Sequence, residues 1–418
     1  MSDQREVQLT IDGRSVTASQ NATILDVARR ENIFIPTLCF DPRLAPFGAC
    51  RVCMVGVRGA RGPVAACTTT VRDGMHIDTH NAQARAVASG VVELLLSDYP
   101  ESKIQSSDVK AQNEFQHVVR HFGLTRSRFD GERHTYERDD RHPYIKVDLN
   151  QCIVCGRCVR ACDEIQGAFA LSYAGRGFQT KIVAGLDGAF SDSSCVSCGA
   201  CVQTCPTGAL DEAAFLSKAS VDRTVTTTCG YCGVGCTLEA QVRDETVIAI
   251  EPSMTGPANH GHACLKGRFA HQYANANDRL KTPLMRRSDG SLREASWDEA
   301  LSFVAKRLGE IARTSGPMAV AAISSSRCTN EENYVLQKIF RAALGSNSID
   351  NCSRVCHSPT SLGLIQSLGE SGGTNCFDDI DLTHCILLTG ANPTEGHPVV
   401  GARLKQAVLR GSKLIVID

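Results

Sequence analysis

Cysteine is the residue type that most clearly indicates chemistry in this sequence. Sixteen of the 21 cysteines form four groups of four with short, regular spacing. The groups are Cys39, Cys50, Cys53 and Cys67; Cys152, Cys155, Cys158 and Cys162; Cys195, Cys198, Cys201 and Cys205; and Cys229, Cys232, Cys236 and Cys264. Cysteine thiolates hold iron–sulfur clusters, and each cluster takes four protein ligands. The sequence therefore predicts four clusters and, with them, the transfer of single electrons.

The second and third groups share the spacing Cys-x2-Cys-x2-Cys-x3-Cys and form an internal repeat. In this arrangement three cysteines of a run bind one [4Fe–4S] cluster, and the fourth binds the other. The second run ends in Cys205-Pro206, as expected, whereas the first departs from the pattern with Cys162-Asp163. Two zinc sites are the alternative, but zinc does not need a crossed fourth ligand. The expected ligand sets are Cys152, Cys155, Cys158 and Cys205 for one cluster, and Cys195, Cys198, Cys201 and Cys162 for the other.

Length and composition limit the setting. A chain of 418 residues predicts about three domains, and a hydrophobic content of 42% allows each of them a core. The net charge of −1 gives no sign of binding to nucleic acid or to an anionic membrane. No apolar run approaches a membrane span, and the N-terminus lacks a secretion signal. A disulfide framework is the other use of many cysteines, but it accompanies secretion, so we expect a reducing cytoplasm.

The residues around the first group predict a small ferredoxin. Residues 7–17 alternate apolar and polar side chains around Asp12-Gly13, which predicts a β-hairpin. Residues 23–30 predict a helix with a threonine N-cap. The cysteines follow in glycine-containing loops, which is the order of a β-grasp ferredoxin. Residues 82–97 have helical periodicity, and the mixed charge run at 126–143 predicts a solvated linker.

The motifs PTLCFDPRLAPFGACRVCMV and AACTTTVRDGMHI resemble the N-terminal [2Fe–2S] domain of the large iron–sulfur subunit of respiratory complex I and of NAD-linked hydrogenases. In that family, a cluster with one histidine and three cysteine ligands comes next. Here the corresponding stretch reads LLLSDYPESKIQSS. Tyr99 stands in place of the histidine, and no cysteine occurs between Cys67 and Cys152. We therefore predict that this cluster is absent.

The fourth group and the motif CLKGRFA at 264–270 resemble the [4Fe–4S] lobe of molybdenum- or tungsten-bis-pyranopterin oxidoreductases. In that family a lysine just after the last cysteine lies between the cluster and the pterin. Lys266 takes this position, and the resemblance implies that it bridges the two and stabilises the charge of the extra electron. Without the motif, Lys266 would be interpreted as a surface lysine.

From residue 297 onward the pattern becomes α/β. A capping box at Ser296-x-x-Glu299 begins the first of three predicted helices, and buried strands alternate with them. Strand, glycine loop, helix and strand form a βαβ unit of a doubly wound sheet. The last predicted strand ends the chain, and a parallel strand buried on both faces is an unusual terminus, so we expect a fragment. The helices are predicted at 297–314, 331–344 and 398–410, and the strands at 318–324, 385–390 and 413–418.

One cysteine outside the four groups has distinctive neighbours. The segment NCSRVCHSPT at 351–360 closely resembles the active-site loop of metal-dependent formate dehydrogenases. The resemblance implies that Cys356 binds the metal and that His357 handles the proton of formate. Assimilatory nitrate reductases usually lack the adjacent histidine, and a histidine that only hydrogen-bonds its loop is the alternative for His357. We expect three other cysteines to be small buried hydrophobic residues: Cys328, Cys376 and Cys385.

A loop in the α/β part fits a dinucleotide. Residues 390–398 (GANPTEGHP) follow a buried strand and precede a helix, where backbone N–H groups and the helix N-terminus suit a pyrophosphate. By composition these are ordinary turn residues, but they resemble the GxNPTExHPV stretch of pterin enzymes. At the end of the next strand, an acidic residue can bind a ribose or guanine. The implied guanine-dinucleotide contacts are Gly390, Asn392, Pro393, Thr394, Glu395, His397 and Asp418.

The predicted fold class is α+β and α/β multidomain, with five segments. They are a [2Fe–2S] β-grasp ferredoxin domain (1–80), a helical segment and charged linker (81–144), a two-[4Fe–4S] ferredoxin domain (145–217), a [4Fe–4S] lobe of the pterin enzyme (222–280) and a truncated α/β bis-pyranopterin-binding catalytic domain (281–418).

These resemblances imply the N-terminal part of the catalytic α subunit of a cytoplasmic, NAD-linked formate dehydrogenase that reversibly oxidises formate to CO2. The implied cofactors are one [2Fe–2S] cluster, three [4Fe–4S] clusters and molybdenum or tungsten bis-molybdopterin guanine dinucleotide. Electrons would reach a separate flavin- and NAD-binding diaphorase subunit in a hetero-oligomer, because no strand–GxGxxG–helix occurs in this sequence. The arginine that holds formate lies, by resemblance, beyond residue 418. The alternatives are a complex I-type electron-transfer subunit without catalytic metal, and another pterin enzyme such as nitrate reductase.

Overall fold

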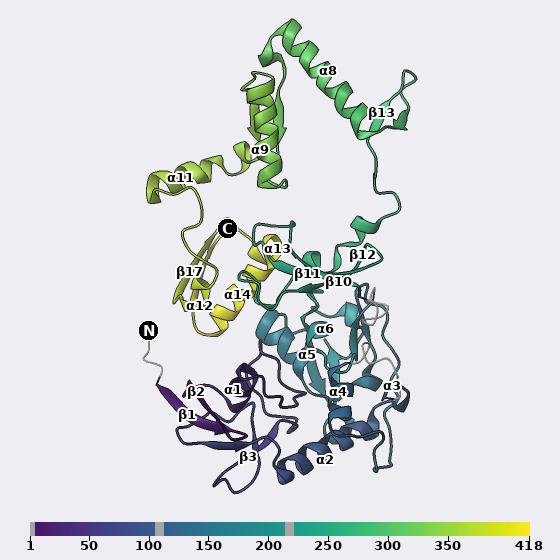
Figure 1. Ribbon diagram of the computed structural model, residues 1–418, viewed down its shortest axis with the longest axis vertical. Coiled ribbons are helices and arrows are strands. Elements are labelled where there is room, and N and C mark those ends of the chain that lie inside the picture. Colours follow the sequence, from purple (N-terminus) through teal and green to yellow (C-terminus); the bar gives the residue numbers. More distant parts are fainter. Residues whose placement is uncertain (1–4, 105–112, 214–220) are drawn as a thin grey trace. The chain divides into compact units, whose positions relative to one another are not determined.

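The computed structural model describes residues 5–104, 113–213 and 221–418 (Figure 1). The chain divides into two compact units, the first formed by Met1–Gln272 with Ile380–Asp418 and the second by Tyr273–Asp379. Both mix helices and strands. The cysteine-rich segments lie in the first unit, and the loop that contains Cys356 lies in the second.

The first unit begins with a five-stranded sheet that packs against one helix. The predicted hairpin forms, with Asp12 and Gly13 in the left-handed backbone region at its turn. The helix, α1 (Ile24–Arg30), buries its apolar side, and Thr23 and Asp26 complete a capping box worth about 1 kcal/mol. The order of the strands in the sheet is β2-β1-β5-β3-β4. Their bounds are β1 (Glu6–Ile11), β2 (Arg14–Ser19), β3 (Met54–Val57), β4 (Val64–Ala65) and β5 (His76–Asp78).

Three helices follow: α2 (Ala82–Asp98), α3 (Glu101–Ile104) and α4 (Glu114–His121). Tyr99, in place of the expected histidine, ends α2 and is 2% exposed. Its hydroxyl donates to the Thr207 carbonyl (3.2 Å) and accepts from the Asn113 side chain (3.1 Å), and its ring packs on Phe115. Burial raises the pKa of Tyr99 to about 12, so the hydroxyl stays protonated. Tyr99 therefore joins the helices to the cysteine module through packing and hydrogen bonds.

Residues 126–143 contain no helix or named strand, as expected for a linker, but they are held against neighbouring elements. Arg128 forms an ion pair with Glu93 on α2 (2.8 Å), and His134 bonds Asp98 (2.6 Å). His142 is 4% exposed and accepts backbone N–H groups at its Nδ1 atom. The charge run thus becomes a strap with partners, which its composition did not predict.

The repeat region forms a small module around its cysteines. The helix of the first run is α5 (Arg157–Arg160), extended by a π-type turn over Ala161–Gln166, and that of the second is α6 (Ala200–Thr204). The two helices contact each other and the π-type turn. Two short antiparallel pairs complete the module: β6 (Ile145–Val147) with β9 (Leu210–Glu212), and β7 (Leu171–Ala174) with β8 (Lys181–Ala184).

A three-stranded antiparallel sheet and one short helix carry the fourth group of cysteines. The strands are β10 (Arg223–Thr228), β11 (Thr237–Arg243) and β12 (Thr246–Pro252), and β11 alternates buried and half-buried side chains. The helix α7 (Leu265–Phe269) begins directly after Cys264. It packs against β12.

The βαβ unit predicted near residue 400 is also part of the first unit. Strand β17 (Cys385–Thr389) pairs in parallel with β18 (Lys413–Ile417), and α13 (Pro393–Gly396) and α14 (Pro398–Leu409) connect them. In the described residues this sheet has two strands, so the expected double-sided burial is not seen. The helix α12 (Asp379–Leu382) precedes it, beginning at the end of the second unit.

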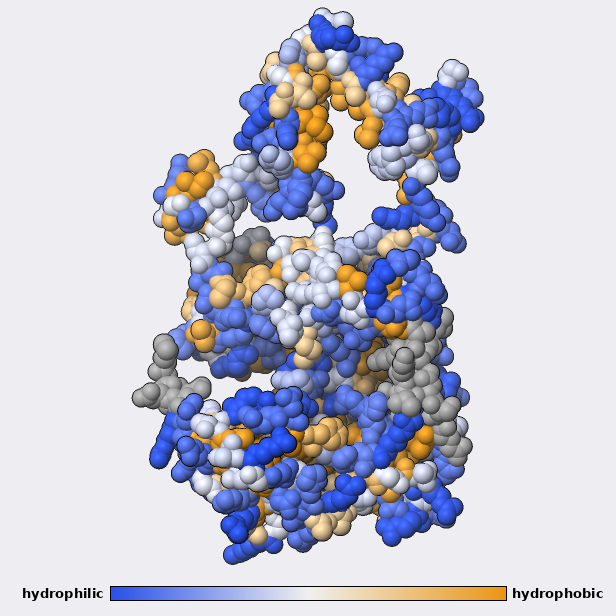
Figure 2. Space-filling model, viewed as in Figure 1, coloured by the Kyte–Doolittle hydropathy of each residue, from blue (hydrophilic) through white to orange (hydrophobic). Residues whose placement is uncertain are grey.

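The second unit contains a hairpin, helices and a separate parallel pair. Several expected elements form, although β15 is shorter than predicted and half-exposed. Figure 2 shows hydrophobic side chains on the surface around α8. The exposed apolar residues of this helix include Leu301 (59% exposed) and Phe303 (53%). The elements are β13 (Leu284–Arg286), β14 (Leu292–Glu294), α8 (Trp297–Ser315), β15 (Ala322–Ser324), α9 (Asn330–Lys338), β16 (Ile349–Asn351), α10 (Ser353–Cys356) and α11 (Ser358–Leu368).

Among the described residues, no helix combines the length and the apolar character needed to cross a membrane.

Replacing Tyr99 by phenylalanine should lower the free energy of unfolding by about 1 kcal/mol, because the ring keeps its packing and only the hydroxyl is lost. Asn113 still donates to the Thr207 carbonyl at 2.7 Å, so that oxygen stays paired. Denaturant unfolding followed by circular dichroism measures the change, with the half-buried Tyr136→Phe as the control. Iron content should stay the same, and loss of a cluster's iron from Tyr99→Phe would show that Tyr99 is a ligand.

Candidate functional site

The four thiols of the first cysteine group form a chain of hydrogen bonds that runs from Cys50 through Cys39 and Cys67 to Cys53. The thiols of Cys50 and Cys67 donate to Cys39, and this lowers the pKa of Cys39 to about 2. Cys67 also donates to Cys53, whose pKa falls to about 7. The donors respond in the opposite direction, so the pKa values of Cys50 and Cys67 are raised. Four thiols this close can bind the two irons of a [2Fe–2S] cluster, so the donor set fits that group.

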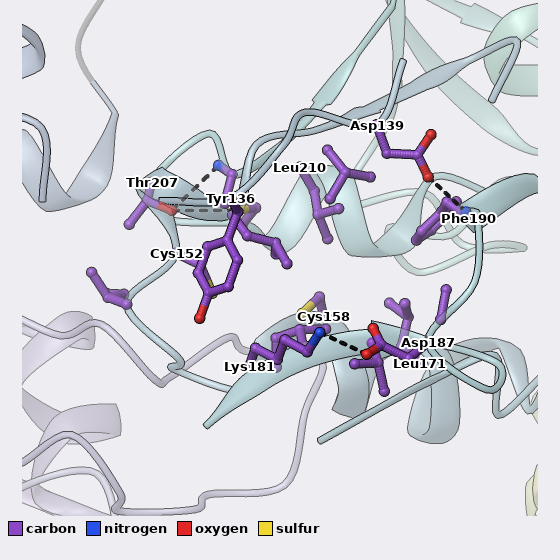
Figure 3. A pocket seen from close by; sticks show the side chains of 18 of the residues that line it. Tyr136, Asp139, Cys152, Cys158, Leu171, Lys181, Asp187, Phe190, Thr207 and Leu210 are labelled. Atoms are coloured by element: carbon purple, nitrogen blue, oxygen red, sulfur yellow. Dashed lines mark hydrogen bonds and ion pairs between the residues drawn. The ribbon is translucent and has the colours of Figure 1, made fainter. Parts of the chain in front are cut away.

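The first three cysteines of the first run share a cavity with the last cysteine of the second run. Cys152, Cys155, Cys158 and Cys205 all line it, and its volume is about 370 Å³. Figure 3 shows Cys152 and Cys158 on its wall, with Tyr136 and the ion pair of Lys181 with Asp187 beside them. Burial, followed by the charge of Cys205, raises the pKa of Cys155 to about 12. The structure therefore brings together the crossed set that the spacing predicted.

The complementary set lines a second, smaller cavity. Its wall includes Cys162 together with Cys195, Cys198 and Cys201. Backbone N–H groups point at two of these sulfurs, from Ser197 to Cys195 (3.3 Å) and from Ala170 to Cys162 (3.2 Å). Hydrogen bonds to the ligating sulfurs influence the reduction potential of a bound cluster.

The loop geometry that gathers these thiols is repeated in both runs. Gly156 and Gly199 occupy equivalent positions and have φ values of +75° and +73°, in the left-handed region that favours glycine. Val154 and Ser197 are also equivalent and adopt φ values of 49° and 55°. A Cβ at Gly156 would overlap the Tyr173 hydroxyl, so this glycine is needed for space as well as conformation.

The fourth group gathers around the start of α7. Burial raises the pKa of Cys236 to about 12, and the charges of Cys229, Cys232 and Cys264 add to this effect. The backbone N–H of Cys229 donates to the Cys236 carbonyl at 2.8 Å. Burial also raises the pKa of Cys229, while the positive charge of Lys266 opposes the shift. Lys266 therefore lies close enough to the cysteines to act on them electrostatically.

Cys356 and His357 lie in the second unit, at the end of α10. Both are exposed, and the His357 backbone N–H donates to the Ser353 carbonyl at 2.8 Å. The neighbouring Cys352 accepts the Ser326 backbone N–H at 3.2 Å. Cys328, Cys376 and Cys385 are exposed, contrary to the buried positions that we expected. Among the described residues of their own units, no other segment covers these three cysteines.

The dinucleotide loop is partly assembled. Asn392, Pro393 and Thr394 line one cavity together with Asp418, so the end of β18 does lie beside the loop after β17. The Gly390 N–H donates to the Ile417 carbonyl at 2.8 Å. The backbone of Gly390 has a φ of 55°. Gly390, Glu395 and His397 do not line this cavity. The geometry suits a ligand that touches the turn and the acidic strand end at once.

Within the parts of the chain that the structure describes, no three His, Cys, Asp or Glu side chains are placed to hold a single metal ion. This does not conflict with cluster binding, because the four cysteines of a [4Fe–4S] cluster each bind a different iron.

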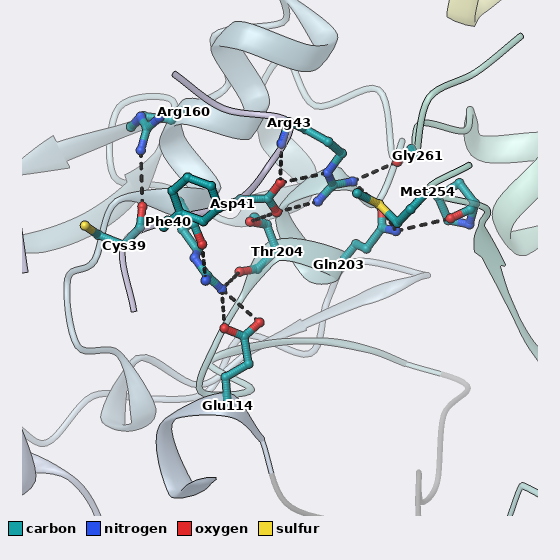
Figure 4. A network of polar contacts seen from close by, with 12 residues as sticks. Cys39, Phe40, Asp41, Arg43, Glu114, Arg160, Gln203, Thr204, Met254 and Gly261 are labelled. Atoms are coloured by element: carbon teal, nitrogen blue, oxygen red, sulfur yellow. Dashed lines mark hydrogen bonds and ion pairs between the residues drawn. The ribbon is translucent and has the colours of Figure 1, made fainter. Parts of the chain in front are cut away.

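The buried polar network at the loop that follows Cys39 was not predicted from the sequence (Figure 4). Arg43 pairs with Asp41 (2.7 Å) and donates to Gln203 Oε1 (2.6 Å) and to the Gly261 carbonyl (2.7 Å). Thr204 donates to Asp41 at 2.7 Å, and these bonds hold the pKa of Asp41 well below its usual range despite its burial. One loop therefore contacts α6 and the segment before Cys264. The only sign of this network in the sequence is the pair of charged residues Asp41 and Arg43 close to Cys39, and two charges by themselves do not predict a buried network.

Two double substitutions distinguish crossed from sequential ligand sets. Cys195→Ala with Cys205→Ala should remove two clusters, about eight irons, because the structure places these thiols in different sets. Cys152→Ala with Cys205→Ala should remove one cluster, about four irons. Iron analysis of protein purified without oxygen measures both. The reverse pattern of losses would show that each run binds its own cluster.

The comparisons with protein families agree with this division of the chain. Residues 4–82 match the model for "2Fe-2S iron-sulfur cluster binding domain" and residues 142–211 the model for "NADH-quinone oxidoreductase subunit 3, ferredoxin-like domain". Residues 222–276 match "Molybdopterin oxidoreductase Fe4S4 domain" and residues 279–418 match "Molybdopterin oxidoreductase".

Among curated proteins, the chain is similar to "Probable oxidoreductase YjgC" of Bacillus subtilis (strain 168), with 31% identity over 451 residues. It is also similar to "Putative formate dehydrogenase SAUSA300_2258" of Staphylococcus aureus (strain USA300), with 29% identity over 457 residues. The alignments cover 98% and 99% of this chain but 46% of each relative. The chain thus spans about half the length of these relatives.

Two solved structures overlap parts of the chain. An NAD+-reducing [NiFe]-hydrogenase in the H2-reduced state matches 49% of this chain and 87% of its own, with 27% identity and a TM-score of 0.45. Acetylene hydratase from Pelobacter acetylenicus matches 46% of this chain and 27% of its own, with 24% identity and a TM-score of 0.40.

From the four family matches, the chain joins a [2Fe–2S] domain and a complex I-type ferredoxin-like domain to the Fe4S4 and pterin domains of the molybdopterin oxidoreductases.

Proposed function

We propose that this chain is the N-terminal part of the catalytic subunit of a formate dehydrogenase that passes electrons to a flavin- and NAD-binding partner. The observation that carries the proposal is the Cys356-His357 pair within NCSRVCHSPT, in a chain that also has Lys266 beside the fourth cysteine group. The formate dehydrogenase name of the Staphylococcus relative supports the same substrate.

The proposed reaction converts formate to CO2, one proton and two electrons. A bound molybdenum or tungsten bis-pyranopterin would accept the two electrons, and bound clusters would carry them away singly. Cys356 supplies a thiolate ligand for the metal. His357 takes the proton, because an imidazole can both accept and return one near neutral pH. Asn392, Pro393, Thr394 and Asp418 hold the guanine dinucleotide in the cavity that they line, and Gly390, Glu395 and His397 shape its loop.

The partner is inferred from what the N-terminal half carries. The complex I-type match at residues 142–211 and the [2Fe–2S] domain fit delivery of single electrons to a flavin. The sequence has no dinucleotide fingerprint for NAD, so the nicotinamide site is assigned to a diaphorase-type subunit in a hetero-oligomer. All 21 cysteines are free of disulfides, which fits a reducing compartment such as the cytoplasm.

Elemental analysis of the full-length protein, purified without oxygen, tests the proposal. About one molybdenum or tungsten per chain, together with the iron of four clusters, is the expected result. A complex I-type electron-transfer subunit is the second candidate, favoured by the family match at residues 142–211. Iron without molybdenum or tungsten would support that second candidate and overturn the first.

Replacing Cys356 by serine should abolish formate oxidation and leave the iron content unchanged, because one metal ligand is lost and no cluster ligand is touched. Formate-dependent dye reduction measures the activity. Cys352→Ser is the matched control, because it removes an exposed thiol from the same loop. Retained formate oxidation by Cys356→Ser would show that Cys356 is not the ligand.

Replacing Lys266 by alanine should slow turnover roughly tenfold, equivalent to about 1.4 kcal/mol, without loss of molybdenum or tungsten. The reason is that a positive charge beside the fourth cysteine group stabilises an electron arriving there. The exposed Lys146 on β6 offers a control, Lys146→Ala. Unchanged turnover in Lys266→Ala would mark this lysine as a bystander.

A further inference from the structure

Two arginines beside the repeat cysteines are almost completely buried. Arg157 is 3% exposed and Arg268 is 2% exposed. Within the described part of the chain, Nε of Arg157 and both Nε and Nη1 of Arg268 are buried without a hydrogen-bond partner. Burying a charge costs several kcal/mol unless opposite charge compensates it. Each guanidinium therefore has a carboxylate near it, Glu114 for Arg157 and Glu212 for Arg268, but keeps buried N–H groups that no described acceptor satisfies.

Arg268 lies across the turn that joins two cysteines of the second run. A Cβ at Gly199, between Cys198 and Cys201, would overlap the Arg268 side chain. Burial raises the pKa of Cys198 to about 12, and the charge of Arg268 opposes that rise. The nearest paired carboxylate, Glu212, is 3.8 Å from the Arg268 Nη2 atom, which is too long for a hydrogen bond. The Arg268 side chain thus lies against the turn that carries Cys198, with Glu212 as a buried carboxylate nearby.

Arg157 belongs to the first run itself and stands between Cys155 and Cys158 in the sequence. Its charge lowers the pKa of Cys155, against the larger effects of burial and of Cys205. Its guanidinium also pairs with Glu114 (2.8 Å) and donates to the Thr204 carbonyl (3.1 Å). Each set of four thiols therefore has one buried arginine.

Both arginines also join the repeat module to the next cluster-bearing segment. Arg157 donates to the Phe40 carbonyl, and Phe40 directly follows Cys39 of the first group. Arg268 belongs to α7, which begins at Cys264 of the fourth group. Each of the two arginines thus lies between the repeat module and a neighbouring cysteine group.

Charge explains what these positions would do. A cluster bound by four thiolates carries net negative charge, and reduction adds one more. A cation held in a poorly solvated site stabilises the reduced form and raises the reduction potential. Surface cations do this weakly, since water and salt screen them.

We propose that Arg157 and Arg268 are positioning residues, each of which compensates the negative charge of one repeat cluster and so raises the reduction potential of that cluster. Arg157 acts on the set with Cys155, and Arg268 acts on the set with Cys198. The inference rests on the cluster assignment within the proposed function, and not on formate as substrate.

The test is a redox titration of the full-length holoprotein with mediators, in which the [4Fe–4S] signals are followed by electron paramagnetic resonance. Arg157→Met and Arg268→Met keep the length and apolar stem of the side chain and remove its charge. At a fixed potential, each variant should lower the reduced-to-oxidised ratio of one signal about tenfold, which is about 59 mV for a one-electron couple. The two variants must move different signals.

Three further variants serve as controls for this test. Arg268→Lys keeps the charge and should restore most of the potential, which covers the case in which the methionine variant misfolds. Glu212→Gln removes the negative charge beside Arg268 and should shift the same signal in the opposite direction. Arg223→Met, at an exposed ion pair on β10, should move neither signal.

Unchanged potentials in both methionine variants, or a shift of the same signal by both, would overturn the proposal. A potential that falls as far in Arg268→Lys as in Arg268→Met would also overturn it, because packing rather than charge would then be responsible. No formate is used, so a failed formate assay contradicts the proposed function alone. Absence of the two [4Fe–4S] signals of the repeat clusters from the unaltered protein would contradict the cluster assignment and this inference together.

Discussion

The exchange of one cysteine between the two halves of the repeat is the constraint on which the first unit depends. Cys205 lies with the thiols of the first run, and Cys162 lies with those of the second. Neither half can complete a set of four alone, so α5 and α6 have to lie against each other. Cys158 and Cys201 also belong to the hydrophobic core of this module, together with large apolar side chains such as Phe190 and Phe269. Its packing and its proposed ligand chemistry thus depend on the same residues.

Buried polar contacts attach neighbouring segments to this module. The loop after Cys39 is held by Asp41 and Arg43, both about 8% exposed at their side chains. Arg157 adds contacts from the module to the same loop and to α4. Buried ion pairs of this kind contribute little net stability but are costly to break, since a lone buried charge remains. They therefore favour one fixed arrangement of the cysteine groups, which electron transfer between clusters needs.

Local sequence patterns predicted the regular elements well. The alternation around Asp12-Gly13, the capping residue Thr23 and the glycines at the helix ends near residue 400 all correspond to observed elements. Such signals depend on a few adjacent residues, so distant packing does not change them. Burial was predicted less well, because Cys328, Cys376 and Cys385 are exposed here, as are the faces of β17 and β18. Burial depends on which other segments cover an element, and that is not a local property.

The strap at residues 126–143 and Tyr99 show the same limit, because the sequence did not predict that these residues would be held by distant partners. Charged and aromatic residues there find partners more than thirty residues away, such as Glu93 for Arg128 and Thr207 for Tyr99. Composition indicated a solvated linker, because it records residue types and not the partners that the fold brings near.

The sequence by itself predicted which cysteines group together, which fourth thiol is exchanged, and where the pterin-type motifs lie. Cysteine spacing is set by the size of the cluster to be held, so it is readable along the chain. Only the tertiary structure decided which buried charges accompany each set of thiols, and it placed Arg157 and Arg268 there. An arginine's role depends on what surrounds it after folding, and neither its type nor its position in the chain reveals whether it will meet water, a carboxylate or a thiolate.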